Sequence, residues 1–146
     1  MKVLNALGYE YPKLALLALI EKGTFHMTDT LEAQTLIYEH QRREIAHCEL
    51  WGPTSYDLIM SKESARLKGY DCPYSGEFDA IIAPELTTAN TLVKSWMIHT
   101  QAEICGAVIG TNVPIALTSR SATARDIYLS AALTAILEDR MSDYQS

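Results

Sequence analysis

Apolar residues along the chain form short continuous runs, separated by longer segments in which apolar and polar residues mix. Continuous runs are typical of buried strands, whereas mixed segments of about ten residues or more favour helices. The predicted strands are 13–20, 45–51, 78–83, 105–109 and 114–117, and the predicted helices are 1–9, 28–43, 54–68, 87–101 and 121–141. The run at 13–20 fits either element by periodicity alone, because its leucines and alanines favour a helix.

The alternation of strands and helices sets the predicted fold class. Strands joined through helices take right-handed crossovers and pair in parallel. We therefore predict an α/β fold, with a mainly parallel sheet of about five strands and helices on both faces. Gly69 is placed to end one helix, and Gly52-Pro53 and Pro84 to end two strands. No linker or repeat divides residues 1–146, so a single domain is expected.

The composition narrows the classes of partner. A net charge of −6 argues against nucleic acid, whose phosphates are bound by clustered Lys and Arg. No segment approaches the roughly 20 apolar residues of a membrane helix, and residues 1–8 lack the long apolar centre of a signal peptide. We expect a cytoplasmic protein with no membrane partner. Cys48, Cys72 and Cys105 are irregularly spaced, which predicts buried reduced thiols and no metal site.

The strongest candidate chemistry lies where the last predicted strand meets the last helix. Ligands of open α/β sheets bind at such junctions, against the amino ends of helices. Thr118, Ser119 and Arg120 follow the strand, and Asp126 lies about two turns further along. Backbone N–H groups, hydroxyls and a guanidinium together form an anion site. Alternatively, Ser119 or Ser121 only caps the helix, and the two charged residues are solvated.

Two further junctions carry polar residues. Glu85, Thr88 and Asn90 follow the strand that Pro84 ends, and Asp57 follows Gly52-Pro53. These side chains either face a ligand or have a structural role only. In that role the first three belong to a helix cap, and Asp57 interacts favourably with the helix dipole.

At these junctions the sequence resembles the phosphate acetyl/butyryltransferase family. The segment 12–22 is similar to the family's Pro-Lys-Val-Ala-Leu-Leu-Ser-x-x-Glu-Lys, and 51–57 resembles its Asp-Gly-Pro-Leu-x-x-Asp. The segment 78–90 looks like Ala-Asp-Ile-Leu-Leu-x-Pro-Asp-Leu-Glu-Ala-Gly-Asn, and 114–120 is close to Pro-Ile-Val-Leu-Thr-Ser-Arg. The resemblance covers nearly the whole chain, in order, and matches the second half of the family's proteins.

The resemblance implies reversible acyl transfer between coenzyme A and phosphate, with a fold like the second domain of the phosphate acyltransferase and isocitrate dehydrogenase group. It assigns catalytic roles to Ser119, Arg120 and Asp126, with Arg120 holding phosphate and Asp126 acting as general base on the thiol. It assigns substrate binding to Thr118, Asn90, Thr88, Glu85 and Asp57. No cofactor is implied beyond the coenzyme A thioester, which is a substrate.

Departures from the pattern leave three functions open. Ala89 replaces the glycine before Asn90, Trp51 replaces an aspartate, and the family's first half, with its basic phosphate contacts, has no counterpart in the sequence. The chain is then an acyltransferase whose other half is supplied by a homodimer partner or by a separately encoded amino-terminal half, or it is a piece of a longer enzyme. Alternatively, it is a non-catalytic homologue that binds acyl-CoA, acyl phosphate, phosphate or a protein, or an unrelated small α/β domain.

Overall fold

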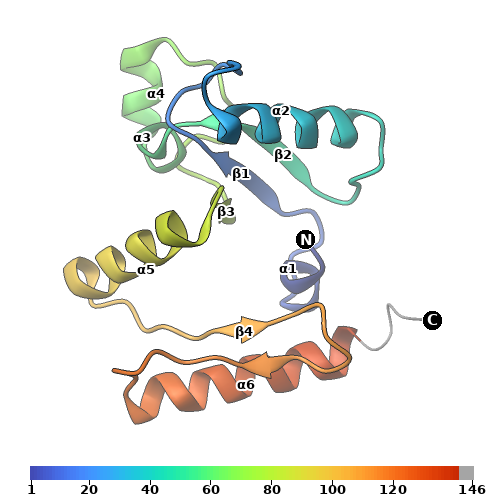
Figure 1. Cartoon of the computed structure of the whole chain (residues 1–146), viewed down its shortest axis with the longest axis vertical. Helices are drawn as coiled ribbons and strands as arrows, with labels where there is room; N and C mark the ends of the chain where they lie inside the picture. The colour runs from blue at the N-terminus through green and yellow to red at the C-terminus, as the bar shows by residue number, and fades with distance from the viewer. Residues whose placement is uncertain (142–146) are drawn as a thin grey trace. The chain divides into compact units, whose positions relative to one another are not determined.

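The apolar run after Pro12 forms a strand at the centre of a parallel sheet. The computed structural model describes residues 1–141, and its strand β1 (Lys13–Leu17) pairs in parallel with β2 (Glu49–Thr54) on one side and β3 (Ala80–Ile82) on the other (Figure 1). The three consecutive residues 14–16 are all buried, and successive strand residues point to opposite faces. Both faces of β1 are therefore covered, which explains a leucine-rich strand.

Strand β2 does not end at Gly52-Pro53 as predicted but continues to Thr54. The register between β1 and β2 shifts by one residue after the pair Ala15–Trp51, so that Leu17 pairs with Thr54. Gly52 has φ 151°, and a Cβ added there would lie 2.6 Å from the Cβ of Leu16. Glycine lets the chain pass this close approach, and the strand resumes beyond it.

The predicted helix at 54–68 is two helices, α3 (Tyr56–Met60) and α4 (Lys62–Lys68). Ser61 separates them because its backbone is extended and its hydroxyl accepts a hydrogen bond from the N–H of Ser64. Serine in that position favours a new helix start over continuation of the old one. Gly69 ends α4 in a left-handed conformation, as predicted, and α2 (Thr28–Gln41) packs along β2.

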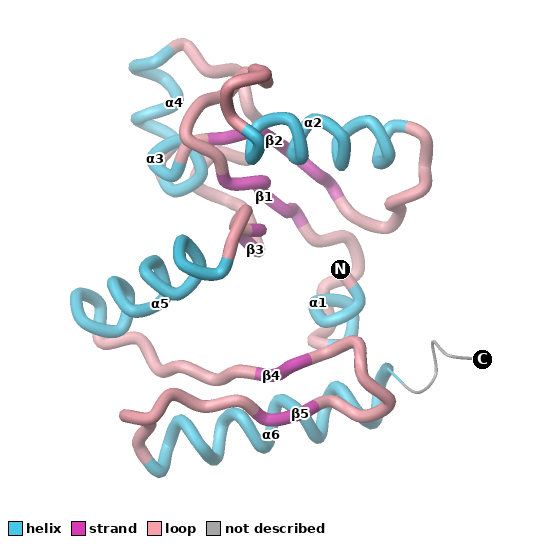
Figure 2. The backbone as a smooth tube through the Cα atoms, viewed as in Figure 1, coloured by secondary structure: helices cyan, strands magenta, loops and turns pink. Residues whose placement is uncertain are grey.

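The prediction of a five-stranded sheet is not confirmed. Strands β4 (Ala107–Val108) and β5 (Ile115–Ala116) form a separate antiparallel pair, and α6 (Ala124–Met141) contacts both strands (Figure 2). The reason is the short connection at 109–114, because antiparallel strands accept a tight turn while parallel strands need a long crossover. The first three strands are joined through helices and pair in parallel, whereas β4, which follows α5, pairs with β5 instead.

The chain divides into two compact units, although a single domain was expected from the sequence. The first unit comprises Met1 and Glu10–Ala89, and the second comprises Lys2–Tyr9 and the chain from Asn90 onward. Helix α5 (Leu86–Thr100) begins in the first unit and continues in the second, and α1 (Lys2–Ala6) packs on α6 within the second. The single-domain prediction stays untested, because compactness alone does not show which parts fold independently.

The apolar core lies almost entirely in the first unit. Its buried apolar residues include Leu14, Ala15, Leu16, Leu50, Leu58, Ile59 and Ala65. In the second unit, only Ala6, Ser130 and Leu137 are buried among the described residues. Cys48 is buried, but Cys72 is half-buried and Cys105 is exposed, so burial of all three thiols was wrong. No helix within residues 1–141 is long and apolar enough to cross a membrane.

Candidate active site at the start of helix α6

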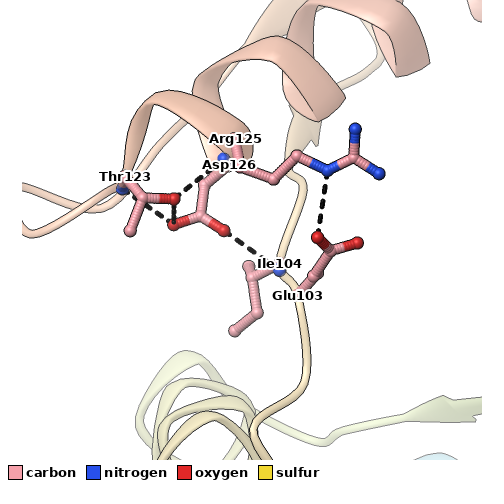
Figure 3. A network of polar contacts seen from close by, with 5 residues as sticks. All are labelled: Glu103, Ile104, Thr123, Arg125 and Asp126. Carbon is pink, nitrogen blue, oxygen red and sulfur yellow. Dashed lines mark hydrogen bonds and ion pairs between the residues drawn. The ribbon is translucent and has the colours of Figure 1, made fainter.

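Helix α6 begins with a reciprocal pair of hydrogen bonds between Thr123 and Asp126. The backbone N–H and the hydroxyl of Thr123 donate to Oδ2 of Asp126 at 2.8 and 2.9 Å, and the N–H of Asp126 donates to the Thr123 hydroxyl at 3.2 Å (Figure 3). This is the capping-box arrangement, with aspartate in the place of the usual glutamate. The alternative in which Ser119 or Ser121 caps the helix is wrong, because α6 begins at Ala124, three residues beyond Ser121, and Thr123 caps it.

The second oxygen of Asp126 faces the segment before β4. The N–H of Ile104 donates to Oδ1 at 3.4 Å, a long and therefore weak hydrogen bond, and Arg125 forms an ion pair with Glu103 beside it at 3.0 Å (Figure 3). The bonds from Thr123 lower the pKa of Asp126 below its ordinary value, because they stabilise the carboxylate. Asp126 is consequently ionised at neutral pH, and Oδ1 is the oxygen with capacity for a further donor.

Lys94 of α5 was not among the residues predicted for the site. Its ammonium donates to the hydroxyl of Ser119 at 2.8 Å, and it lies near enough to Asp126 to contribute to the lowered pKa of that carboxyl. Ser119 also lies 3.1 Å from the hydroxyl of Ser121. A cation, two hydroxyls and a carboxylate therefore gather at one turn.

A small hollow brings three of the predicted site residues together. Thr118, Ser119 and Asp126 line it with Leu117 and Ser130, and its volume is about 10 Å³. That volume suits roughly one water molecule. Arg120 is exposed and does not line this hollow, and Asn90 is exposed on α5. The structure thus joins Ser119 and Asp126, as expected, without bringing Arg120 to them.

In the first unit, Glu85 caps helix α5. Its carboxylate accepts the N–H groups of Thr87 and Thr88, each at 2.6 Å, and also the hydroxyl of Thr88. These bonds lower the pKa of Glu85 from 4.5 to about 2, the Thr88 hydroxyl having the largest effect. Of the residues that were candidates for helix caps at this junction, Glu85 takes the role, and Thr88 donates to it.

A larger pocket lies at the carboxyl ends of the three parallel strands. Its volume is about 520 Å³, within the range of small-molecule sites, and Asp57 and Thr88 line it with Ser55, Lys68 and Asp29. Lys68 forms an ion pair with Asp57 at 2.8 Å and lowers the pKa of that carboxyl. The pocket contains two of the predicted binding residues, in the place where open α/β sheets bind ligands.

Similarity to solved structures defines the class of protein. The structure matches the crystal structure of a branched-chain phosphotransacylase from Enterococcus faecalis with a TM-score of 0.81 and 29% identity, covering 95% of this chain and 50% of that one. A phosphate acetyltransferase of Thermotoga maritima is 35% identical over 93% of this chain and 46% of its own. A phosphate butyryltransferase of Clostridium acetobutylicum is 32% identical over 94% of this chain and 46% of its own length.

The family follows from a match along most of the sequence. The model of the phosphate acetyl/butaryl transferase family matches residues 1–135. The chain belongs to this family, as the resemblance indicated. It spans about half the length of the relatives that it matches.

Proposed function

We propose that this chain supplies part of the active site of a phosphate acyltransferase, which moves an acyl group reversibly between coenzyme A and inorganic phosphate. The observation that carries the proposal is the turn before α6, where Ser119 and Asp126 line one hollow and Lys94 donates to Ser119. A carboxylate beside a cation and hydroxyls offers a proton acceptor next to groups that bind phosphate.

Asp126 accepts the thiol proton in the proposed reaction. A thiol with an ordinary pKa near 8.5 is mostly protonated at neutral pH, so it needs a base as it attacks acyl phosphate. Oδ2 of Asp126 is occupied by the two Thr123 donors, whereas among the described residues Oδ1 accepts only the long hydrogen bond from Ile104. The sulfur then forms a bond to the acyl carbon, the carbon–oxygen bond to phosphate breaks, and phosphate leaves.

Cationic groups near the turn stabilise the phosphate in this proposal. Lys94 donates to the Ser119 hydroxyl oxygen, which polarises the O–H of Ser119 as a donor toward an anion. Arg120 is the adjacent guanidinium, and its exposure leaves it able to reach a phosphate bound at the mouth of the hollow.

The described site is too small to act alone. A hollow of about 10 Å³ holds neither phosphate nor the end of coenzyme A, so further walls are required. The relatives are about twice as long as this chain. We therefore assign the remaining walls to a complementary half, equivalent to the part of the relatives that this chain does not span.

The proposal is tested by turnover and by ligand protection, measured on the same preparations. The chain is mixed with the complementary half of the Thermotoga maritima relative, and release of thiol from acetyl-CoA or butyryl-CoA is followed with and without phosphate. Phosphate-dependent release that requires both chains is expected. A rise of the melting temperature with coenzyme A, but no release of thiol, would establish a non-catalytic binding protein. If neither thiol release nor a rise of the melting temperature is observed, both the catalytic and the binding function are excluded.

A further inference from the structure

The two oxygens of the Asp126 carboxylate are held differently. Oδ2 accepts the N–H of Thr123 at 2.8 Å and its hydroxyl at 2.9 Å, whereas in the described part of the chain Oδ1 accepts only the N–H of Ile104, at 3.4 Å (Figure 3). The last torsion of an aspartate side chain is broad, so a free carboxylate rotates easily. Two short bonds to one oxygen restrict that rotation and keep Oδ1 on the side of Ile104.

The main chain of Asp126 is fixed by a different residue. The hydroxyl of Ser130, a side chain that is only 1% exposed, accepts the N–H of Gly106 at 3.1 Å and donates to the carbonyl oxygen of Asp126 at 2.8 Å. This buried hydroxyl joins the first turn of α6 to the segment before β4. With the main chain held in this way, the orientation of the carboxylate depends on its own contacts, and the two short ones come from Thr123.

We propose that Thr123 is a positioning residue for the acyl transfer, because it occupies Oδ2 of Asp126 and leaves Oδ1 as the oxygen that takes the thiol proton. This inference rests on the proposed function. When the proton moves from sulfur to Oδ1, Oδ2 becomes the carbonyl oxygen of a neutral acid and still accepts both Thr123 donors. A proton on Oδ2 would instead disrupt those bonds and the cap of α6. The sulfur electron pair forms the bond to the acyl carbon, and phosphate leaves with the electrons of the carbon–oxygen bond.

The same contacts set the pH range in which Asp126 is available as a base. The N–H of Thr123 has the largest effect in lowering the pKa of Asp126, and the Thr123 hydroxyl comes next. Lys94 of α5 lowers this pKa as well, and Arg125 and Glu103 beside the carboxylate are paired with each other. Removal of the hydroxyl leaves these charges in place. The pKa of Asp126 should therefore rise, and the ionised base should be lost at a higher pH than in the wild type.

The test compares the wild type with Thr123→Val and Thr123→Ser in two measurements. Carbon-13 NMR of the full chain gives the pKa of the Asp126 carboxyl, and thiol release by the chain with the complementary half of the Thermotoga maritima relative gives kcat and KM across pH. Thr123→Val keeps the backbone N–H but lacks the hydroxyl. It should raise the Asp126 pKa and lower kcat about ten-fold with little change in KM, because the base is no longer held in place. The loss should be greatest at acid pH, and Thr123→Ser should restore both values.

The matched control is Ser61→Ala, which removes a helix cap far from Asp126 in the sequence. The Ser61 hydroxyl accepts the N–H of Ser64 at 3.1 Å and caps α4 in the first unit. Its loss should lower the stability of the chain to a similar degree. The pKa of Asp126 and the value of kcat should stay as in the wild type, which separates positioning from a general loss of stability.

Three results would overturn the inference. They are an Asp126 pKa that is the same in the wild type and Thr123→Val, an equal fall of kcat in Thr123→Val and Ser61→Ala, and a raised pKa with an unchanged kcat. If the wild type binds its complementary half but releases no thiol, the proposed function fails. In that case the NMR titration still decides whether Thr123 holds the carboxylate.

Discussion

The hydroxyl of Thr123 both receives the N–H of Asp126 and donates to its carboxylate. Replacement by alanine removes both bonds, and loss of a helix cap of this kind costs about 1 kcal/mol of the free energy of unfolding. Thr123→Ala should therefore unfold at lower urea concentration, and Thr123→Ser, which keeps the hydroxyl, should resemble the wild type. Equal unfolding midpoints for all three proteins would show that the cap contributes nothing measurable.

Glu85 gives a prediction with a defined pH range. Its pKa is about 2 in the folded chain, against an ordinary value of 4.5, so the folded state is the weaker proton binder. The resulting stability is complete above pH 4.5 and is lost as the pH falls through that value toward 2. Glu85→Gln should lower the melting temperature near neutral pH, and the difference from the wild type should shrink under acid conditions.

The control for this experiment is Glu32→Gln, since Glu32 is exposed on α2. Its difference from the wild type should stay small. A Glu85→Gln difference that grows as the pH falls would contradict the assigned sign.

Asp126 was predicted as a site residue from the sequence, but most of the contacts around it were not. The spacing of Thr123 and Asp126 is that of a capping box and is readable from the sequence. The bond from Lys94 to Ser119, in contrast, joins residues 25 positions apart on different elements. Local patterns carry no information about such a contact. The exposed position of Arg120 is likewise set by the path of the turn, and residue type does not reveal it.

At the end of α4, substitution of Gly69 tests the effect of backbone conformation without a change in packing. Its φ is 63°, and a Cβ at this position would meet nothing within 4 Å. Gly69→Ala should thus cost about 1 kcal/mol through left-handed strain alone. Gly69→Asn should cost less, because asparagine adopts this conformation more readily. Urea unfolding of the three proteins gives the order, and an alanine variant as stable as the wild type would refute the argument.

Most elements were predictable, whereas their grouping was not. The positions of all five strands were predicted approximately, because each contains a short continuous apolar run. The split between α3 and α4 was missed because Ser61 was read as a helix residue, although serine followed by Lys-Glu-Ser also suits a helix start. The short connection between β4 and β5 indicates their antiparallel pairing. The expectation of a parallel sheet rested on the helices between the earlier strands and did not take this connection into account.

For the whole molecule, the uneven core predicts uneven stability. Buried apolar residues concentrate around β1, while few residues of the second unit are buried in the described part of the chain. Regions with few buried contacts open at lower free energy. Hydrogen exchange of the chain alone should protect the amides of β1 at least about ten-fold more than those of β4 and β5. Equal protection would mean that the second unit is stable without a cover.

A cytoplasmic location and a homodimer stay predictions, and the resemblance left the acyl group open between acetyl and butyryl. The relatives named above are phosphate acetyltransferases, butyryltransferases and a branched-chain phosphotransacylase, so they do not select one acyl chain. Comparing the rates of thiol release from acetyl-CoA and butyryl-CoA identifies the preferred acyl group.

The most direct measurement is the rate of phosphate-dependent thiol release by the chain with its complementary half, in wild type, Arg120→Ala, Asp126→Asn and Arg125→Ala. Arg125 is the matched control, an exposed arginine of α6 whose partner is Glu103. The Arg120 and Asp126 variants should lose about 100-fold or more in kcat, as is usual when a charge-stabilising group or a general base is removed, while Arg125→Ala keeps the wild-type rate. Full activity in Asp126→Asn, or equal losses in both arginine variants, would contradict an active site at the start of α6.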